Sequence, residues 1–411
     1  MSVDIKKLLV KPTAKIAQKA IPLHPATAAD WDALQDERAK KIAASQNFNG
    51  LPGQLLILRK NDGVTPEKIY IGIDSPDNMW ALSGAAEKLP DGTYRIDENA
   101  LTLTPEQAHK LSLGWALARY NFTVKRGVLH SAPHEQSPRL VIPAVAQDRY
   151  NEIKTELEAT WKTRDLINTP ANILNTRELA QETLTLAAEF NAKAKCIHGK
   201  TLEKKFPLVH AVGKASTNPP QLAYFSWIGS NADRDALNIL LVGKGVTFDT
   251  GGIQVKPGAS MEGMKKDMGG AATALGLARM IMGNDLPVKL NVVIPIAENA
   301  ISKNAMRPSD IITARDGTEI EIGHTDAEGR LILADALSFG VQKWQPELVL
   351  DFATLTGAQR VADGTGVGGI IRNDKDMGRK MEDIGESWND DLQLHHLFEK
   401  YRPLLKSQNG G

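Results

Sequence analysis

Two glycine-rich stretches in the second half of the chain bring together acidic and basic side chains. The first, VGKGVTFDTGGIQVKPGASMEGMKKDMGG, contains Lys244, Asp249, Lys256 and Asp267. The second, EIGHTDAEGRLILADAL, contains Asp326, Glu328 and Arg330. Carboxylate oxygens are the ligands that hard and borderline divalent cations prefer, and glycine lets the backbone approach an ion closely. We therefore expect an oxygen-rich site for one or two divalent metal ions.

This prediction rests on the combination of residues. One Lys or Asp in a glycine-rich loop is ordinarily a solvated turn residue, whereas seven such residues together favour a site. In extended backbone, residues i and i+2 point to the same side, so Asp326 and Glu328 can face one metal pair. We interpret Asp310 and Asp335 as structural. The nine histidines include no H-E-x-x-H motif, so a zincin-type zinc site is not expected.

Three nearly continuous apolar runs must position these residues. They are LNILLVGKG (237–245), LNVVIPIAE (290–298) and ELVLDFATLTG (347–357). Such runs are typical of strands that are covered on both faces, and ligand sites in open α/β sheets lie beyond the carboxyl ends of the strands. The stretch GGAATALGLARMIMG (269–283) predicts a helix directly after Asp267.

The first part of the chain predicts a separate α/β domain without a catalytic cluster. Its expected elements are strands at 54–60 and 68–74 and a helix at 109–122. Ile153, Leu157 and Trp161 recur at helical spacing and predict a long connecting helix. A length of 411 residues favours two domains, which we place at 1–150 and 151–411.

Composition excludes several classes of protein. Lys and Arg total 49, as do Asp and Glu, so no global positive field favours nucleic acid or anionic lipid, and nucleic acid is not an expected partner. Cys196 is the only cysteine, which excludes an internal disulfide. The sequence contains no run of 18 apolar residues and its first 20 residues lack a signal-peptide apolar region. We expect a cytoplasmic protein without a membrane partner, with a short amphipathic presequence as the lesser alternative.

The two glycine-rich stretches resemble the motifs VGKGITFDSGG and NTDAEGRL of the leucine aminopeptidase (cytosol aminopeptidase) family. The similarity runs from RDLINTPANILNT (164–176) through ATLTGA (353–358), and more faintly to residue 407. Two long motifs in the right order are far more specific than a short glycine pattern. The resemblance implies a smaller, macro-like N-terminal α/β domain. It also implies a catalytic α/β domain with a mixed sheet flanked by helices, of the phosphorylase/hydrolase-like kind, and a homo-hexamer.

The resemblance also implies the metal ligands. Asp249 and Glu328 would bridge two metal ions, Lys244 and Asp267 would complete the tighter site, and Asp326 would complete the more exchangeable one. Mn²⁺ or Zn²⁺ is expected, with Mg²⁺ or Co²⁺ as alternatives. A lysine ligand must be a neutral amine, so adjacent dications would have to lower its pKa far below roughly 10.4.

The implied activity is metal-dependent removal of N-terminal residues, preferentially leucine and similar apolar ones, from peptides by attack of a bridging hydroxide. Lys256 would stabilise the oxyanion, and Arg330 would hold a bicarbonate ion that acts as general base. The family's pocket for the first side chain corresponds to Met264, Thr354, Leu355, Thr356 and Gly357.

The chain departs from the family pattern in three places. His324 replaces an Asn before Thr325, which is either a neutral variation, our preferred interpretation, or a hydrogen bond that alters a ligand's support. Gln359 and Arg360 replace small and apolar residues, and could change the pocket floor. The chain stops at LLKSQNGG, where family members continue for several tens of residues.

Two other functions remain open from sequence. One is a metal-retaining pseudoenzyme or DNA-binding accessory protein with little peptidase activity, against which the neutral charge argues. The other is a metallohydrolase of phosphoesters, for which the carboxylates would serve but the two lysines are unexpected.

Overall fold

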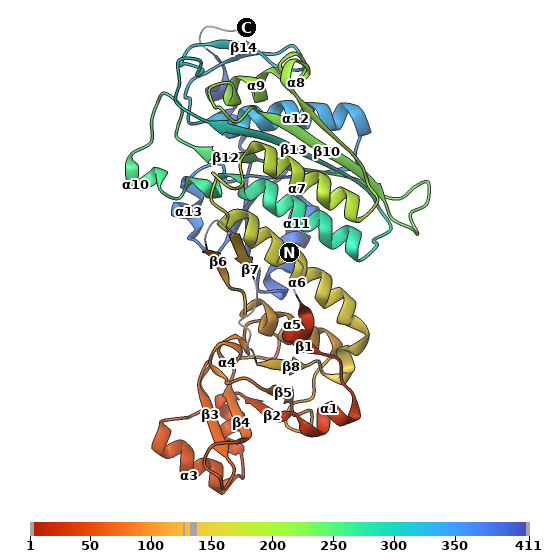
Figure 1. Ribbon diagram of the computed structural model, residues 1–411, viewed down its shortest axis with the longest axis vertical. Helices are drawn as coiled ribbons and strands as arrows, with labels where there is room; N and C mark the ends of the chain where they lie inside the picture. Colours follow the sequence, from red (N-terminus) through yellow and green to blue (C-terminus); the bar gives the residue numbers. More distant parts are fainter. Residues whose placement is uncertain (1–3, 126–127, 132–137, 408–411) are drawn as a thin grey trace. The chain divides into compact units, whose positions relative to one another are not determined.

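The computed structural model describes residues 4–125, 128–131 and 138–407 (Figure 1). These residues form two compact units, and the chain visits each of them twice. The first unit comprises Met1–Trp161 and Ala358–Leu397, and the second comprises Lys162–Gly357 and Phe398–Gly411. None of the described helices has the length and hydropathy that a membrane span requires.

The first unit is built on a six-stranded sheet in the order β1-β8-β5-β2-β4-β3. All neighbouring strands are parallel except the antiparallel pair β3–β4, which confirms the two strands expected at 54–60 and 68–74. The strands are β1 (Leu9–Val10), β2 (Ile21–Ala26), β3 (Leu55–Arg59), β4 (Pro66–Gly72), β5 (Thr93–Ile96) and β8 (Arg139–Val141). The short strands β6 (Phe122–Lys125) and β7 (Val128–Ser131) pair with each other.

The helix expected at 109–122 is present as α5, although it begins earlier, at Pro105, and ends at Leu117. The first part of this unit contains several helices. They are α1 (Ala14–Lys19), α2 (Ala28–Ala33), α3 (Glu37–Gln46), α4 (Ser83–Lys88), α5 (Pro105–Leu117) and the start of α6 (Tyr150–Asn168), with 3₁₀ turns at Ile5–Lys7 and Ala144–Arg149. A capping box between Thr104 and Gln107 starts α5, because each side chain accepts from the other's backbone N–H. The predicted spacing on α6 is confirmed, since Ile153, Leu157 and Trp161 are all buried in the core of this unit.

The segment 358–397 completes the first unit. It contains α13 (Ala358–Asp363), β17 (Gly368–Ile371), α14 (Lys375–Ser387) and β18 (Leu392–His395). Trp388 packs against the main core of the unit. The Asn389 side chain accepts from the backbone N–H of Met79 at 2.8 Å, and Lys110 Nζ donates to the Ser387 carbonyl at 2.6 Å. Residues far apart in sequence therefore build one core.

The second unit contains a mixed sheet in the order β16-β11-β13-β10-β9, with β12 also paired to β13. The strands β11, β12, β13 and β16 are mutually parallel, whereas β10 is antiparallel to both of its neighbours. Their bounds are β9 (Lys193–His198), β10 (Gln221–Ile228), β11 (Asn238–Gly243), β12 (Gly245–Asp249), β13 (Lys289–Asn299) and β16 (Leu348–Phe352). All three apolar runs thus form strands, as predicted.

Helices cover both faces of this sheet (Figure 1). On one face, α7 (Thr176–Glu189) and α11 (Gly269–Gly283) share a core with Val292 and Ile294 of β13. On the other face, Val293 packs with α8 (Gly199–Lys205), α9 (Pro207–Gly213) and α12 (Glu328–Trp344). Alternate residues of β13 enter opposite cores, which explains why the run is apolar throughout. The remaining elements are α10 (Gly258–Met261), β14 (Ile311–Thr313), β15 (Glu319–Glu321) and 3₁₀ turns at Met264–Met268 and Glu399–Leu405.

Four parallel strands deliver polar residues to one edge of the sheet. Lys244 follows β11, Asp249 ends β12, Asn299 ends β13 and Thr354 lies just beyond β16. The backbone N–H of Lys244 donates to the Phe352 carbonyl at 2.9 Å, which joins the residue after β11 to the last residue of β16. The carboxyl edge is therefore where side-chain chemistry converges, as expected for an open α/β sheet.

Candidate metal centre

Lys244 occupies the centre of the cluster and is 2% exposed. Its Nζ lies 2.8 Å from Asp267 Oδ1 and 3.0 Å from Glu328 Oε1, and it donates to the Thr354 carbonyl at 3.2 Å. Gly329 makes room for this side chain, because a Cβ at that position would lie 2.7 Å from Lys244 Cε. The glycine after Glu328 is thus a packing requirement of the lysine.

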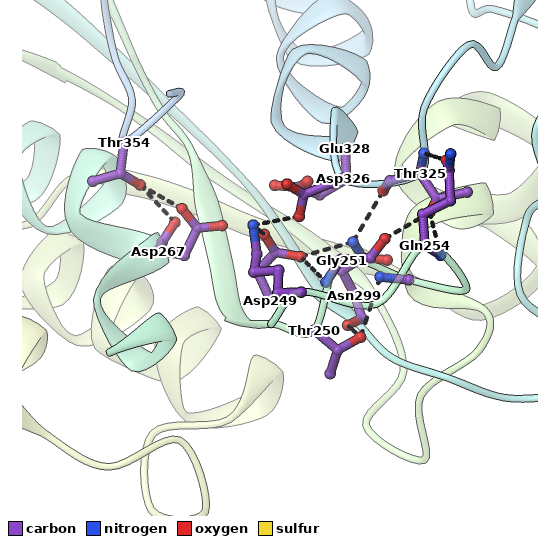
Figure 2. Close-up of polar contacts among 12 residues, drawn as sticks. Asp249, Thr250, Gly251, Gln254, Asp267, Asn299, Thr325, Asp326, Glu328 and Thr354 are labelled. Carbon is purple, nitrogen blue, oxygen red and sulfur yellow. Dashed lines mark hydrogen bonds and ion pairs between the residues drawn. The ribbon is translucent and has the colours of Figure 1, made fainter. Parts of the chain in front are cut away.

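Asp249 is held from one side and leaves its other oxygen toward the cluster (Figure 2). Its Oδ1 accepts from the Gly251 backbone N–H at 2.9 Å and from Asn299 Nδ2 at 2.8 Å. Its Oδ2 lies 2.8 Å from Lys256 Nζ, which also contacts Asp326. The carboxylate orientation is therefore set before any cation binds.

The backbone around Asp326 and Glu328 differs from the prediction. Asp326 lies in a turn and Glu328 is the first residue of α12, so the expected extended alternation is wrong. The carboxylates converge because the turn leads directly into the helix. One oxygen from each of Asp249, Asp326 and Glu328 lies within 4.8 Å of the others. The helix N-terminus also favours the negative charge of Glu328.

Asp267 is not in that group of three and is linked to it through Lys244. It lies in the 3₁₀ turn Met264–Met268 rather than in an irregular loop, and its Oδ1 also accepts from Thr354 Oγ1 at 2.8 Å. Among the described residues, Asp267 Oδ2 and Glu328 Oε2 are buried without a hydrogen-bond partner. Buried carboxylate oxygens need a partner, and a divalent cation is one that suits them. The donor set therefore fits a metal centre.

Burial and charge shift the proton affinities in this cluster. Burial raises the pKa of Glu328 to about 8, with Lys244 opposing the shift and Asp249 and Asp267 adding to it. Burial likewise raises the pKa of Asp267, again against Lys244. Burial would lower the pKa of Lys244, but Glu328 and Asp267 outweigh it and the pKa is raised. Four carboxylates face two lysines, so negative charge is in excess and favours added cations.

Lys256 is also kept cationic. Burial would lower its pKa, but hydrogen bonds and charge from Asp249 and Asp326 raise it above the usual value. Arg330 is exposed on the first turn of α12. Lys256 contacts two of the carboxylates. The catalytic roles of Lys256 and Arg330 remain predictions.

The residues predicted to bind substrate lie on two segments of the second unit. Met264 is half-buried at the start of the 3₁₀ turn that carries Asp267, and Leu355, Thr356 and Gly357 are exposed beyond β16. Thr354 has an additional role that the sequence did not indicate. Its hydroxyl donates to the carboxylate and the carbonyl of Asp267, so it fixes a predicted ligand.

Asn299 is a positioning residue that sequence reasoning missed. It is 2% exposed, and its Nδ2 donates both to Asp249 and, at 3.1 Å, to the Thr325 carbonyl. The available signal was a polar residue at the end of an apolar strand.

His324 shows how the departure from Asn is accommodated. Its Nδ1 accepts from the backbone N–H of Asp326 at 3.1 Å. An Asn side-chain oxygen commonly makes this same i to i+2 hydrogen bond in a turn. The imidazole nitrogen therefore supplies the acceptor that Asn would supply, which supports the interpretation of a neutral variation.

The α/β architecture and the buried carboxylate–lysine cluster define a metal-dependent hydrolase. Residues 161–410 match the model of the cytosol aminopeptidase family, catalytic domain, and residues 20–143 match the M17 aminopeptidase N-terminal domain. The chain belongs to the M17 cytosol aminopeptidase family and is a metal-dependent aminopeptidase.

Similar proteins and solved structures support the same family assignment. A probable cytosol aminopeptidase of Brucella anthropi is 33% identical over 390 residues, covering 90% of this chain and 78% of the relative. The crystal structure of cytosol aminopeptidase from Coxiella burnetii is 36% identical with a TM-score of 0.88, covering 98% of this chain and 85% of that one. The bottromycin maturation enzyme BotP in complex with Mn is 26% identical with a TM-score of 0.83, covering 95% and 85%.

Proposed function

We propose that this aminopeptidase removes N-terminal leucine and similar apolar residues from peptides at a two-metal centre. The observation that carries the proposal is the set of converging carboxylates in which buried oxygens of Asp267 and Glu328 lack a protein partner. Asp249 and Glu328 would bridge the ions, Lys244 and Asp267 would complete one site, and Asp326 the other. The structure of BotP with Mn supports Mn²⁺, with Zn²⁺ as the second choice.

Bound metal ions would supply Lewis-acid polarisation of the scissile carbonyl and activation of water. The chain's own residues would do the rest. Lys256, held cationic beside Asp249 and Asp326, would donate a hydrogen bond to the oxyanion that develops on the scissile carbonyl. Arg330 would hold a bicarbonate ion that accepts a proton from water and returns it to the leaving amine.

Selectivity for the first side chain would come from Met264 and the turn Thr354, Leu355, Thr356 and Gly357. An apolar lining prefers Leu-like side chains, although each methylene changes selectivity by only about 1–3 kcal/mol. The names of the relatives support a cytoplasmic location, and the family resemblance supports a homo-hexamer.

Hydrolysis of Leu-p-nitroanilide and a Leu-containing dipeptide tests the proposal. Metal-free protein refilled with Mn²⁺ or Zn²⁺ should turn over both substrates, and should not turn over an N-acetylated substrate or a phosphoester. Glu328→Gln should lower turnover by about a thousandfold. Metal binding without turnover would contradict the proposed activity, and absence of metal binding would contradict the site.

A further inference from the structure

Thr325 joins the two segments that carry the predicted ligands. It is fully buried, and each of its polar atoms has a partner. Its carbonyl accepts from Asn299, and its hydroxyl donates to the Gly251 carbonyl at 2.6 Å. The side-chain oxygen of Gln254 accepts from the Thr325 backbone N–H at 2.8 Å, while the Gln254 backbone N–H donates to Thr325 Oγ1 at 3.1 Å. The turn and the loop are thus locked by reciprocal hydrogen bonds (Figure 2).

The loop between β12 and α10 is shaped for this contact. Gly251 and Gly252 have φ angles of +89° and +71°, a conformation that side chains disfavour. A Cβ on Gly252 would lie 2.9 Å from Thr325 Cβ, so the loop packs directly on the turn. The Lys256 N–H donates to the Thr250 carbonyl at 2.9 Å and closes the loop. Lys256 and Gln254 therefore belong to the same closed loop.

Asp326 is held differently from the other carboxylates, because its carboxylate pairs with Lys256 and its backbone N–H donates to His324 Nδ1. Asp249 is fixed by Gly251 and Asn299, and Asp267 is fixed by Thr354 and Lys244. The Asp326 side chain is 31% exposed, against 6% or less for Asp249, Asp267 and Glu328. Asp326 directly follows Thr325 in the chain, and its ion-pair partner Lys256 lies on the loop that carries Gln254.

We propose that Gln254 is a positioning residue that clamps the Thr325 turn to the Lys256 loop and thereby sets metal affinity on the Asp326 side of the centre. The proposal rests on the proposed two-metal function. The side-chain oxygen and the backbone N–H of Gln254 both bond Thr325, so Gln254 acts on the metal site through Thr325. Loss of its acceptor would leave the Thr325 N–H buried without a partner and free the turn to shift.

Mn²⁺ titration of the metal-free protein by calorimetry, with electron paramagnetic resonance of bound Mn²⁺, tests this proposal. Wild type should bind two equivalents, and a failure here would contradict the two-metal function itself rather than the clamp. Gln254→Met keeps the side-chain length and removes the acceptor. It should leave the first equivalent unchanged and weaken the second by about tenfold or more. Saturating Mn²⁺ should restore its kcat.

Two further variants control the result. Gln254→Glu keeps an acceptor oxygen and should bind the second ion at least as tightly as wild type. Gln181→Met makes the same change on the exposed face of α7 and should match wild type. Unchanged binding of both ions by Gln254→Met, or equal weakening of both, would overturn the proposal. If Gln254→Met does not fold, Gln254→Asn, whose amide is one methylene shorter, should show the same selective loss.

Discussion

Two buried carboxylates on α12, Asp335 and Glu328, differ in their hydrogen-bond partners. Asp335 and Glu328 are both almost fully buried, and burial raises the pKa of each. Asp335 is satisfied by backbone N–H groups, with Oδ2 accepting from Leu208 at 2.8 Å and Oδ1 from Arg315 at 3.0 Å. Glu328 has one oxygen beside Lys244 and another without a hydrogen-bond partner among the described residues. A carboxylate with complete backbone partners anchors structure, whereas one left incomplete is available to a cation.

The largest expected effect is a loss of activity on substitution of Glu328, the carboxylate that we propose binds metal. Glu328→Gln should lower kcat/KM with a leucyl substrate by about a thousandfold. A neutral amide holds metal ions poorly, and the metal ions supply several kcal/mol of transition-state stabilisation. The raised pKa means that the fold favours the uncharged form of Glu328, and that this contribution to stability is lost as the pH rises through about 8. Metal-free Glu328→Gln should therefore unfold no more easily than wild type at pH 9. A clear loss of stability in a denaturant titration would contradict the comparison.

The second prediction concerns stability at Asp335. Asp335→Ala should lower the free energy of unfolding by about 3 kcal/mol, since the N-terminus of α9 and the backbone of Arg315 lose a buried acceptor. Asp335→Asn retains one acceptor oxygen and should lose less. Chemical denaturation measures both changes. Folded Asp335→Ala should keep wild-type Mn²⁺ affinity, and loss of metal at unchanged stability would show that the two roles are not separate.

Competition between protons and Mn²⁺ for Glu328 should distinguish Glu328 further from Asp335. Glu328 carries a proton below its pKa of about 8, and a metal ion must displace that proton to bind. Apparent Mn²⁺ affinity should therefore fall as the pH falls from 8 to 6, by roughly tenfold per unit for each proton displaced. Calorimetry in buffers of different ionisation enthalpy counts the released protons. Asp335→Asn should keep the wild-type slope, and a pH-independent affinity would contradict the assignment of Glu328.

The smallest expected effect is at His324. His324→Asn should change Mn²⁺ affinity and kcat/KM by less than about threefold, because Asn supplies the same acceptor for the Asp326 N–H. His324→Ala removes the acceptor and serves as the contrast. A larger change for Asn than for Ala would show that the imidazole does more than support the turn.

The sequence predicted elements and ligands where local pattern was decisive. The helix at Gly269–Gly283 and strand β13 have the predicted positions, because small residues and an uninterrupted apolar run are local signals. Asp249, Asp326 and Glu328 converge as expected: Asp249 ends the parallel strand β12, and the turn after β15 brings Asp326 and Glu328 to it. The resemblance to a family supplied their individual roles, which no local pattern contains.

Other features depend on contacts between distant residues. The geometry expected around Asp326 was wrong because the helix begins at Glu328, directly after the turn that contains Asp326. Gln254 and Thr325 are 71 residues apart, so nothing in either segment indicates their reciprocal bonds. Asn299 and Thr354 likewise acquire their roles from the strands that bring them to the sheet edge.

The return of residues 358–397 to the first unit has a consequence for biosynthesis. Ribosomes release about 5–20 residues per second, and domains ordinarily fold as units when their last residue emerges. Here the core around Met79 and Lys110 receives Ser387, Trp388 and Asn389 only after the whole span 162–357 has been made. The second unit's sheet can therefore form while the first unit, although earlier in the chain, still waits for its last segment.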